Sequence, residues 1–176
     1  MHFRPCIDIH NGKVKQIVGG SLTDQGNQAK ENFTASENAD YYAKMYQKDG
    51  LIGGHVILLN PVSSEYYRET KAQAILALGA YPKGLQVGGG IHAENAEEFL
   101  KAGASHVTVT SYVFRDGKIN WKNMEKLKHE VGKENVVIDL SCRKKEDGYY
   151  IVTDPWQKFT HVKLTQKVLR GIAGYS

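Results

Sequence analysis

The chain has 176 residues, of which 41% are hydrophobic and 24% charged, a composition typical of a single globular domain. The formal charge of +4 is mild, and no basic stripe is interleaved with aromatic residues, so the sequence argues against a nucleic-acid partner and allows an anionic small-molecule substrate. No apolar run approaches the ~18 residues of a membrane span, and two cysteines, Cys6 and Cys142, argue against a disulfide framework.

The first half of the chain predicts short strands that alternate with helices. Apolar residues mark Cys6–Ile9 and Val14–Val18 as two short strands joined by a turn. The polar stretch Gly19–Asn32 has no periodicity and predicts a loop. Next come a helix, a strand and a helix, expected at Ala39–Gln47, His55–Leu59 and Ser64–Leu78.

The second half repeats this alternation. A strand at Leu85–Val87 stops at three glycines, and a helical pattern then runs to Ala102. Arg143–Val152 predicts a hairpin that turns at Asp147–Gly148. The remaining predictions are strands at His106–Val109 and Val136–Leu140 and helices at Asn120–Val131 and Thr165–Ile172.

Buried strands that alternate with amphipathic helices predict an α/β fold with a parallel sheet covered by helices. Two architectures compete. One is an open, doubly wound sheet, and the other is an incomplete (βα)8 TIM barrel. A complete barrel needs ~250 residues, so the length of the chain favours the open sheet.

An internal repeat favours the barrel. Ile7–Val18 and Ile138–Val152 each contain a strand with an aspartate, a turn with glycine and a second strand that ends in Ile-Val. Four βα units separate the two copies, as expected for a barrel made of two similar halves. We therefore predict one partial barrel domain over residues 1–176, with a first half at about 1–134 and the start of a second half at 135–176. It would hold about the first five βα units.

The glycines Gly88, Gly89 and Gly90 predict a phosphate site. Glycine lets the main chain approach an anion closely, and the following helix offers free N–H groups at its positive end. Thr110 and Ser111, at the end of the next strand, can add hydroxyl donors. The alternative for the glycines is a tight turn without a ligand, and for Thr110 and Ser111 a helix cap.

Asp8 and Asp139 occupy equivalent places in the repeat and would face each other across the mouth of a barrel. Two such carboxylates can divide the roles of general acid and general base. The alternative for either is a residue that fixes a loop. Trp156 follows the predicted hairpin and can stack on a flat heterocycle. The histidines show no metal-ligand spacing, so we expect no metal. Cys6 and Cys142 belong to opposite strands of the predicted barrel, so we expect neither a disulfide nor a reactive thiol.

Several segments resemble the eukaryotic ProFAR isomerases of histidine biosynthesis, and their sequences are most similar to those of plant-type members. ProFAR is phosphoribosylformimino-5-aminoimidazole carboxamide ribotide. The resemblance covers almost the whole chain, and its most specific block is Asp139–Lys144. The other segments are Phe3–Gly19, Gly53–Ile57, Leu85–Ile91 and Val109–Ser111.

The resemblance implies a (βα)8 barrel that converts the aminoaldose ProFAR into the aminoketose PRFAR, an Amadori rearrangement that uses neither metal nor cofactor. Asp8 would be the general base that removes the C2 proton, and Asp139 the general acid that opens the ribose ring. The glycine turn, Thr110 and Ser111 would hold one of the two substrate phosphates, and Trp156 would cover the substrate. A bulky residue at Gly89 would chiefly weaken phosphate binding.

Two departures accompany the resemblance. Bacterial relatives carry arginine where this chain has Gln16 and His92. Family members also continue for ~80 more residues, judged from typical barrel size, so we expect a carboxyl-terminal truncation.

That expectation raises the alternative of a non-catalytic half-barrel fragment that binds phosphate or associates with itself. A third candidate is the cyclase of the same pathway, and the Asp139–Lys144 block argues against it. Without a recognisable transit peptide we predict a cytoplasmic enzyme, with the plastid as the alternative, and a monomer when complete.

Overall fold

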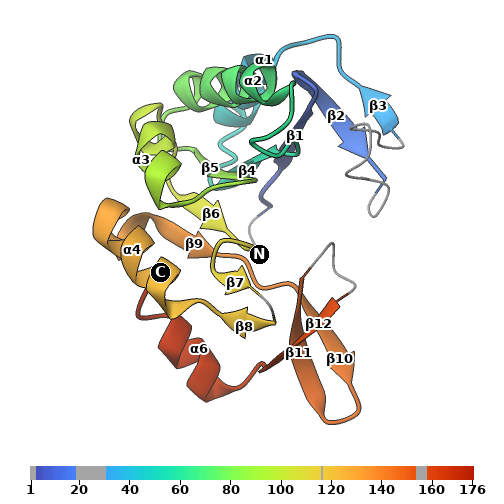
Figure 1. Cartoon of the computed structure of the whole chain (residues 1–176). Helices are drawn as coiled ribbons and strands as arrows, with labels where there is room; N and C mark the ends of the chain where they lie inside the picture. The colour runs from blue at the N-terminus through green and yellow to red at the C-terminus, as the bar shows by residue number, and fades with distance from the viewer. Residues whose placement is uncertain (1–2, 19–30, 116, 154–157) are drawn as a thin grey trace. The chain divides into compact units, whose positions relative to one another are not determined.

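The computed structural model describes residues 3–18, 31–115, 117–153 and 158–176 (Figure 1). The chain forms two compact units, one of Met1–Gly90 with Glu98–Val107 and one of Ile91–Glu97 with Thr108–Ser176. The units are groupings in space and not sequence repeats, so the division into half-barrels at residues 134 and 135 stays a prediction. No helix among the described residues is long and apolar enough to cross a membrane.

The first unit is built on a mixed sheet in which β1, β4 and β5 are parallel. β2 pairs antiparallel with β1 on one side and with β3 on the other. The strands are β1 (Cys6–His10), β2 (Lys13–Ile17), β3 (Glu31–Thr34), β4 (Gly54–Leu58), β5 (Leu85–Gly88) and β6 (Val107–Val109), of which only Val107 belongs to this unit.

The parallel strands β1, β4, β5 and β6 lie beside one another in the order in which they occur along the chain, and β9 (Val136–Ile138) is next in that order. A doubly wound sheet instead reverses its strand order at a switch point, because its helices cover both faces of an open sheet. The observed order contains no such reversal. It is the order of a (βα)-barrel, which confirms the barrel prediction and argues against the open alternative.

Two helices of the first unit begin and end close to their predicted positions. α1 (Ala39–Lys48) buries Ala39 and Ala43, one turn apart, as the predicted face requires. α2 (Tyr67–Ala80) buries its small and apolar residues at helical spacing, namely Thr70, Ala74, Ala77 and Leu78. It begins three residues after the predicted cap, Ser64, because the Ser64 hydroxyl accepts a hydrogen bond from the Tyr66 amide and fixes a turn there instead.

Alternation along β1 and its neighbours divides the sheet into an apolar and a polar face. Ile7 and Ile9 are fully buried, as are Val56 on β4 and Val87 on β5. Each such side chain contributes about 1.5–3 kcal/mol to folding when it leaves water. The intervening side chains of β1, among them Asp8, lie on the opposite face. The core therefore lies on one face of these strands, and the polar side chains lie on the other.

The second unit contains the end of β6, then α4, β9 and a separate antiparallel sheet of three strands. The predicted hairpin is confirmed as β10 and β11, with the turn at Glu146–Asp147, one residue earlier than expected. The bounds are β7 (Phe114–Arg115), β8 (Lys118–Ile119), α4 (Trp121–Val131), a 3-10 turn η1 (Lys133–Asn135), β10 (Cys142–Lys145), β11 (Gly148–Thr153), β12 (Lys158–Lys163) and α6 (Gln166–Ile172).

Three strand features were not predicted. Glu31 and Asn32, placed in the loop Gly19–Asn32, belong to β3, which is too short and polar to show an alternating pattern but pairs with β2. Residues 19–30 of that loop lie outside the described residues. The two-residue strands β7 and β8, and β12, likewise depend on pairing partners more than on their own composition.

A buried polar network joins the loops that follow β1 and β4. The Asn60 side chain is 2% exposed and accepts hydrogen bonds from the Asn11 amide, at 2.8 Å, and from the Thr70 hydroxyl, at 2.7 Å. It donates to the Asn11 side-chain oxygen at 2.8 Å, and the Gly12 amide donates to Thr70 Oγ1 at 3.0 Å. Asn11 and Gly12 both have positive φ, as a two-residue hairpin turn requires. The network therefore fixes the turn that follows β1.

Replacing Asn60 with alanine leaves the Asn11 amide and the Thr70 hydroxyl buried without their acceptor. We expect Asn60→Ala to lower the free energy of unfolding by about 2–4 kcal/mol, since each buried unsatisfied group costs about 1–3 kcal/mol. Urea unfolding followed by circular dichroism measures this. Ser63→Ala, at an exposed site in the same loop, is the control and should change stability by less than about 0.5 kcal/mol. Equal effects of the two substitutions would show that the network is not structural.

Candidate functional site

Asp8 lies in the middle of β1, within the strand that the sequence predicted at Cys6–Ile9. Its backbone is in register with Ile57 of β4, and Ile57 is in register with Gly88, the last residue of β5. Asp8 is therefore level with the carboxyl end of β5, because β1 continues two residues further to pair with β2. Two strand spacings, about 10 Å, separate its backbone from that of Gly88. The half-buried carboxylate thus lies at the edge of the sheet where βα loops begin.

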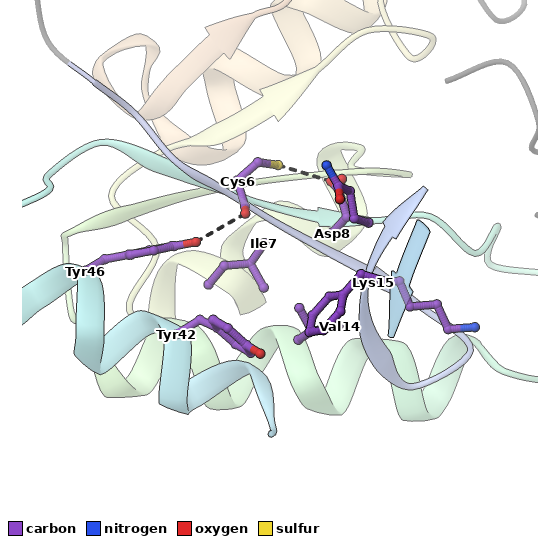
Figure 2. Close-up of a pocket in the computed structure, with 9 residues that line it drawn as sticks. Cys6, Ile7, Asp8, Val14, Lys15, Tyr42 and Tyr46 are labelled. Carbon is purple, nitrogen blue, oxygen red and sulfur yellow. Dashed lines mark hydrogen bonds between the residues drawn. The ribbon is translucent and has the colours of Figure 1, made fainter. Parts of the chain in front are cut away.

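A pocket of about 330 Å³ opens beside Asp8 (Figure 2). Figure 2 shows Cys6 and Asp8 on one side of β1 and Ile7 on the other, toward Tyr42. The Cys6 thiol donates a hydrogen bond to Asp8 Oδ1 at 3.1 Å. The pocket is lined from β1, β2, β3 and α1 by Cys6, Ile7, Asp8, Val14, Lys15, Gln16, Phe33, Tyr42 and Tyr46. Sequence reasoning identified Asp8 and missed the pocket, because β3 was not predicted.

Polar side chains continue across the sheet on the Asp8 face. Cys6 is in register with His55 of β4, and His55 with Gln86 of β5. The pairing of Val87 with Val107 places His106 level with Gln86. These four residues form a polar row two residues before Asp8 along β1. The next row, on the apolar face, consists of the aliphatic residues Ile7, Val56, Val87 and Val107. Such layers of inward-pointing side chains are typical of the interior of a (βα)-barrel.

The glycine turn after β5 needs glycine for a structural reason at one position. Gly89 and Gly90 have φ of +92° and +68°, a region that L-residues rarely adopt. A Cβ atom on Gly89 would collide with the main chain of Leu58, whereas one on Gly90 would meet only Val62, at 3.9 Å. The backbones of Gly89 and Leu58 are therefore in close contact, and Gly90, which is exposed, is where space remains for a ligand.

The first turn of α3 (Ala93–Lys101) is stabilised by its own side chains. The Asn95 side-chain oxygen accepts a hydrogen bond from the His92 amide at 2.8 Å, which caps the helix. Glu94 forms a hydrogen-bonded ion pair with Lys126 of α4 and contacts His92 Nδ1 at 2.8 Å. The Lys126 hydrogen bond, the largest cause, lowers the pKa of Glu94 to about 2. The acidic side chain in this turn therefore has a cationic partner.

In the second unit the structure places Thr110 beside Asp139. Asp139 follows β9, and its amide donates to the Val109 carbonyl at 3.0 Å. The Thr110 hydroxyl donates to Asp139 Oδ2 at 3.4 Å, a long hydrogen bond. Asp139 and Ser111 are exposed. The sequence assigned Thr110 to the phosphate, and the structure adds a contact with the carboxylate that was not predicted.

The remaining predicted features stay predictions. Asp8 and the glycine turn belong to the first unit and Asp139, Thr110 and Ser111 to the second, so their predicted convergence is not tested. Trp156 lies outside the described residues. Among the described residues no group of three or more His, Cys, Asp or Glu side chains lies close enough together to hold a metal ion.

Comparison with known proteins gives one family. Residues 3–172 match the model of a family described as "Histidine biosynthesis protein". A chloroplastic 1-(5-phosphoribosyl)-5-((5-phosphoribosylamino)methylideneamino)imidazole-4-carboxamide isomerase of Medicago truncatula is 50% identical, over 100% of this chain and 56% of its own length. Isomerases of the same name from Saccharomyces cerevisiae and Yarrowia lipolytica are 43% and 42% identical, over 99% and 97% of this chain. The chain spans 65% and 64% of their lengths.

The two glycines can be separated by experiment. We expect Gly89→Ala to lower the free energy of unfolding by more than about 2 kcal/mol, because positive φ costs about 1 kcal/mol and the collision with Leu58 adds to it. Gly90→Ala has the same strain without the collision, so about 1 kcal/mol is expected. Urea unfolding of both variants measures the difference. If the two variants are equally stable, the close contact between Gly89 and Leu58 is absent.

Gly90 is consequently the better position for testing phosphate binding. The sequence suggested that a bulky residue at Gly89 would chiefly weaken phosphate binding, but the main chain of Leu58 leaves no room for such a residue without a change in the fold.

Proposed function

The chain belongs to the histidine biosynthesis protein family, a family of (βα)8 barrels, and we propose from this membership that it isomerises the aminoaldose ProFAR to the aminoketose PRFAR. The observation that carries the proposal is its 50% identity to a plant isomerase with that substrate in its name. Because the chain spans 56% of that relative, the activity is proposed and is tested on this chain directly.

The proposed reaction moves protons between neighbouring atoms. A general acid protonates the ring oxygen of the aminoaldose, and the ribose opens. A general base then removes the proton from C2, and the enol that results tautomerises to the ketone. Every step is a proton transfer or a bond shift within the substrate, so two carboxyl groups with different protonation states suffice.

We assign the base to Asp8. Its support is the position of the carboxylate: half-buried, beside a pocket, and level with the end of β5. Parallel α/β folds bind substrates at the carboxyl ends of their strands. The half-buried position also withdraws the carboxylate in part from bulk water, which strengthens its interactions with a bound substrate.

We assign the acid to Asp139, which follows β9 as the glycine turn follows β5. The hydrogen bond from Thr110 fixes one of its oxygens. The proposal places one substrate phosphate at Gly88–Gly90 with Ser111 and Thr110, and it places Trp156 over the substrate. The mild excess of positive charge in the chain, +4, favours a substrate that carries two phosphates.

Localisation and assembly are also matters of proposal. The Medicago relative is named chloroplastic, which supports the plastid alternative over the cytoplasm. We propose that the binding partner is the small-molecule ribotide substrate and that the full-length enzyme is a monomer.

Substituting either aspartate should remove turnover and not binding. We expect Asp8→Asn and Asp139→Asn each to lower kcat by about 10²–10⁴, the usual contribution of a general acid or base, with KM changed little. Chromatographic separation of ProFAR from PRFAR measures the rates. Asp40→Asn, which removes a partly exposed carboxylate paired with Lys44 on α1, is the control and should leave kcat unchanged.

Near-normal kcat in either active-site variant would remove that residue from its role. If the unsubstituted chain binds ProFAR without converting it, the alternative of a non-catalytic phosphate-binding chain replaces the proposed activity.

A further inference from the structure

The Cys6 thiol is the one side chain, among the described residues, that donates a hydrogen bond to Asp8. Cys6 and Asp8 are two residues apart on β1, so strand alternation places their side chains on the same face. The Sγ–Oδ1 distance of 3.1 Å is short for a hydrogen bond that a thiol donates, and the contact is visible in Figure 2. Oδ2 receives no hydrogen bond from the described residues. The two carboxylate oxygens therefore differ in their surroundings.

We propose that Cys6 is a positioning residue that holds Asp8 Oδ1, so that Oδ2 is the oxygen presented to the substrate proton. The proposal rests on the proposed function in that it gives Asp8 the role of base. A thiol suits this task because it is neutral and a weak donor. A lysine or arginine at the same place would stabilise the carboxylate strongly and make it a poorer base.

The thiol must keep its proton to donate. Desolvation is the largest cause that raises the pKa of Cys6, and the charge of Asp8 and its hydrogen bond raise it further. Part of Cys6 is exposed to solvent, and the two contributions from Asp8 raise the pKa in the same direction as desolvation does. The same contact that orients the carboxylate therefore keeps the thiol protonated and unreactive.

The backbone at Cys6 is held from α1. The Tyr46 hydroxyl donates to the Cys6 carbonyl at 3.4 Å, and Tyr46 and Tyr42 line the same pocket. The other titratable groups around the pair are Lys15 from β2 and His55 from β4, which is in register with Cys6. Because these groups also affect Asp8, the experiment compares variants at Cys6 that leave all of them in place.

The first measurement follows the ionisation of Asp8 in the full chain without any substrate. The carboxyl carbon of Asp8 is observed by NMR during a pH titration, with Asp8→Asn used to assign its resonance. Loss of the donor favours the protonated carboxyl, so Cys6→Ala should raise the titration midpoint by about 0.3–1 pH unit. Cys6→Ser keeps a donor and should leave the midpoint within about 0.2 units or lower it. Cys142→Ala, which removes the other cysteine, is the control and should change nothing.

The second measurement is the reciprocal one. Asp8→Asn removes the neighbouring charge, so the pKa of the Cys6 thiol should fall and its alkylation by iodoacetamide at pH 8 should become at least about threefold faster. The alkylation rate of Cys142, followed in the same sample by mass spectrometry, is the internal reference and should not change. An Asp8 midpoint that is the same in Cys6→Ala as in the unsubstituted chain, together with an unchanged alkylation rate, overturns the proposal.

Activity is the third measurement and separates this proposal from the proposed function. In an active chain, Cys6→Ala should lower kcat with KM unchanged and move the acid limb of the pH–rate profile to higher pH, and Cys6→Ser should restore both. A purely structural role for Cys6 would change stability without moving the profile, and that result also overturns the proposal. If the unsubstituted chain shows no turnover, the proposed function fails, while the NMR and alkylation results still decide whether the thiol holds Asp8.

Discussion

The parallel register of β1, β4 and β5 is the constraint on which the described part of the site depends. Main-chain hydrogen bonds place Asp8 beside Ile57 and Ile57 beside Gly88. This register brings the carboxylate and the glycine turn to the same edge of the sheet. It also places Ile7, Val56 and Val87, one from each strand, on the opposite face, where they are buried. The position of the site and the position of the core are thus two results of one pairing pattern.

Much of this arrangement could be predicted from the sequence, because the signals are local. Three consecutive glycines after an apolar run predicted the βα turn, and the recurrence of aspartate in two similar segments made Asp8 and Asp139 the candidate catalytic residues, which stays a prediction. The choice between a barrel and an open sheet was also correct, although the length of the chain argued the other way. The repeat gave the better answer because strand order depends on how the βα units are arranged, whereas length depends only on how many are present.

The features that were missed depend on contacts between segments distant in the sequence. β3 and β12 are stabilised by their pairing partners, and their own residues show little strand pattern. The contact between Thr110 and Asp139 joins two loops separated by α4. The Cys6–Asp8 contact is different, because cysteine two residues before aspartate on a strand is a pattern visible in the sequence. It is not predicted by the disulfide and reactive-thiol criteria that are usually applied to a cysteine.

The alternation of side chains along β1 has a consequence for folding itself. A strand that paired with β4 one residue out of register would exchange its two faces. Ile7 and Ile9 would then lie on the polar face of the sheet, and the carboxylate of Asp8 would enter the aliphatic layer, where an unpaired charge is very unfavourable. Asp8 therefore also disfavours the slipped register of β1 during folding. An Asp8→Leu chain would therefore lose part of the energetic gap that separates the correct pairing of β1 from the slipped one.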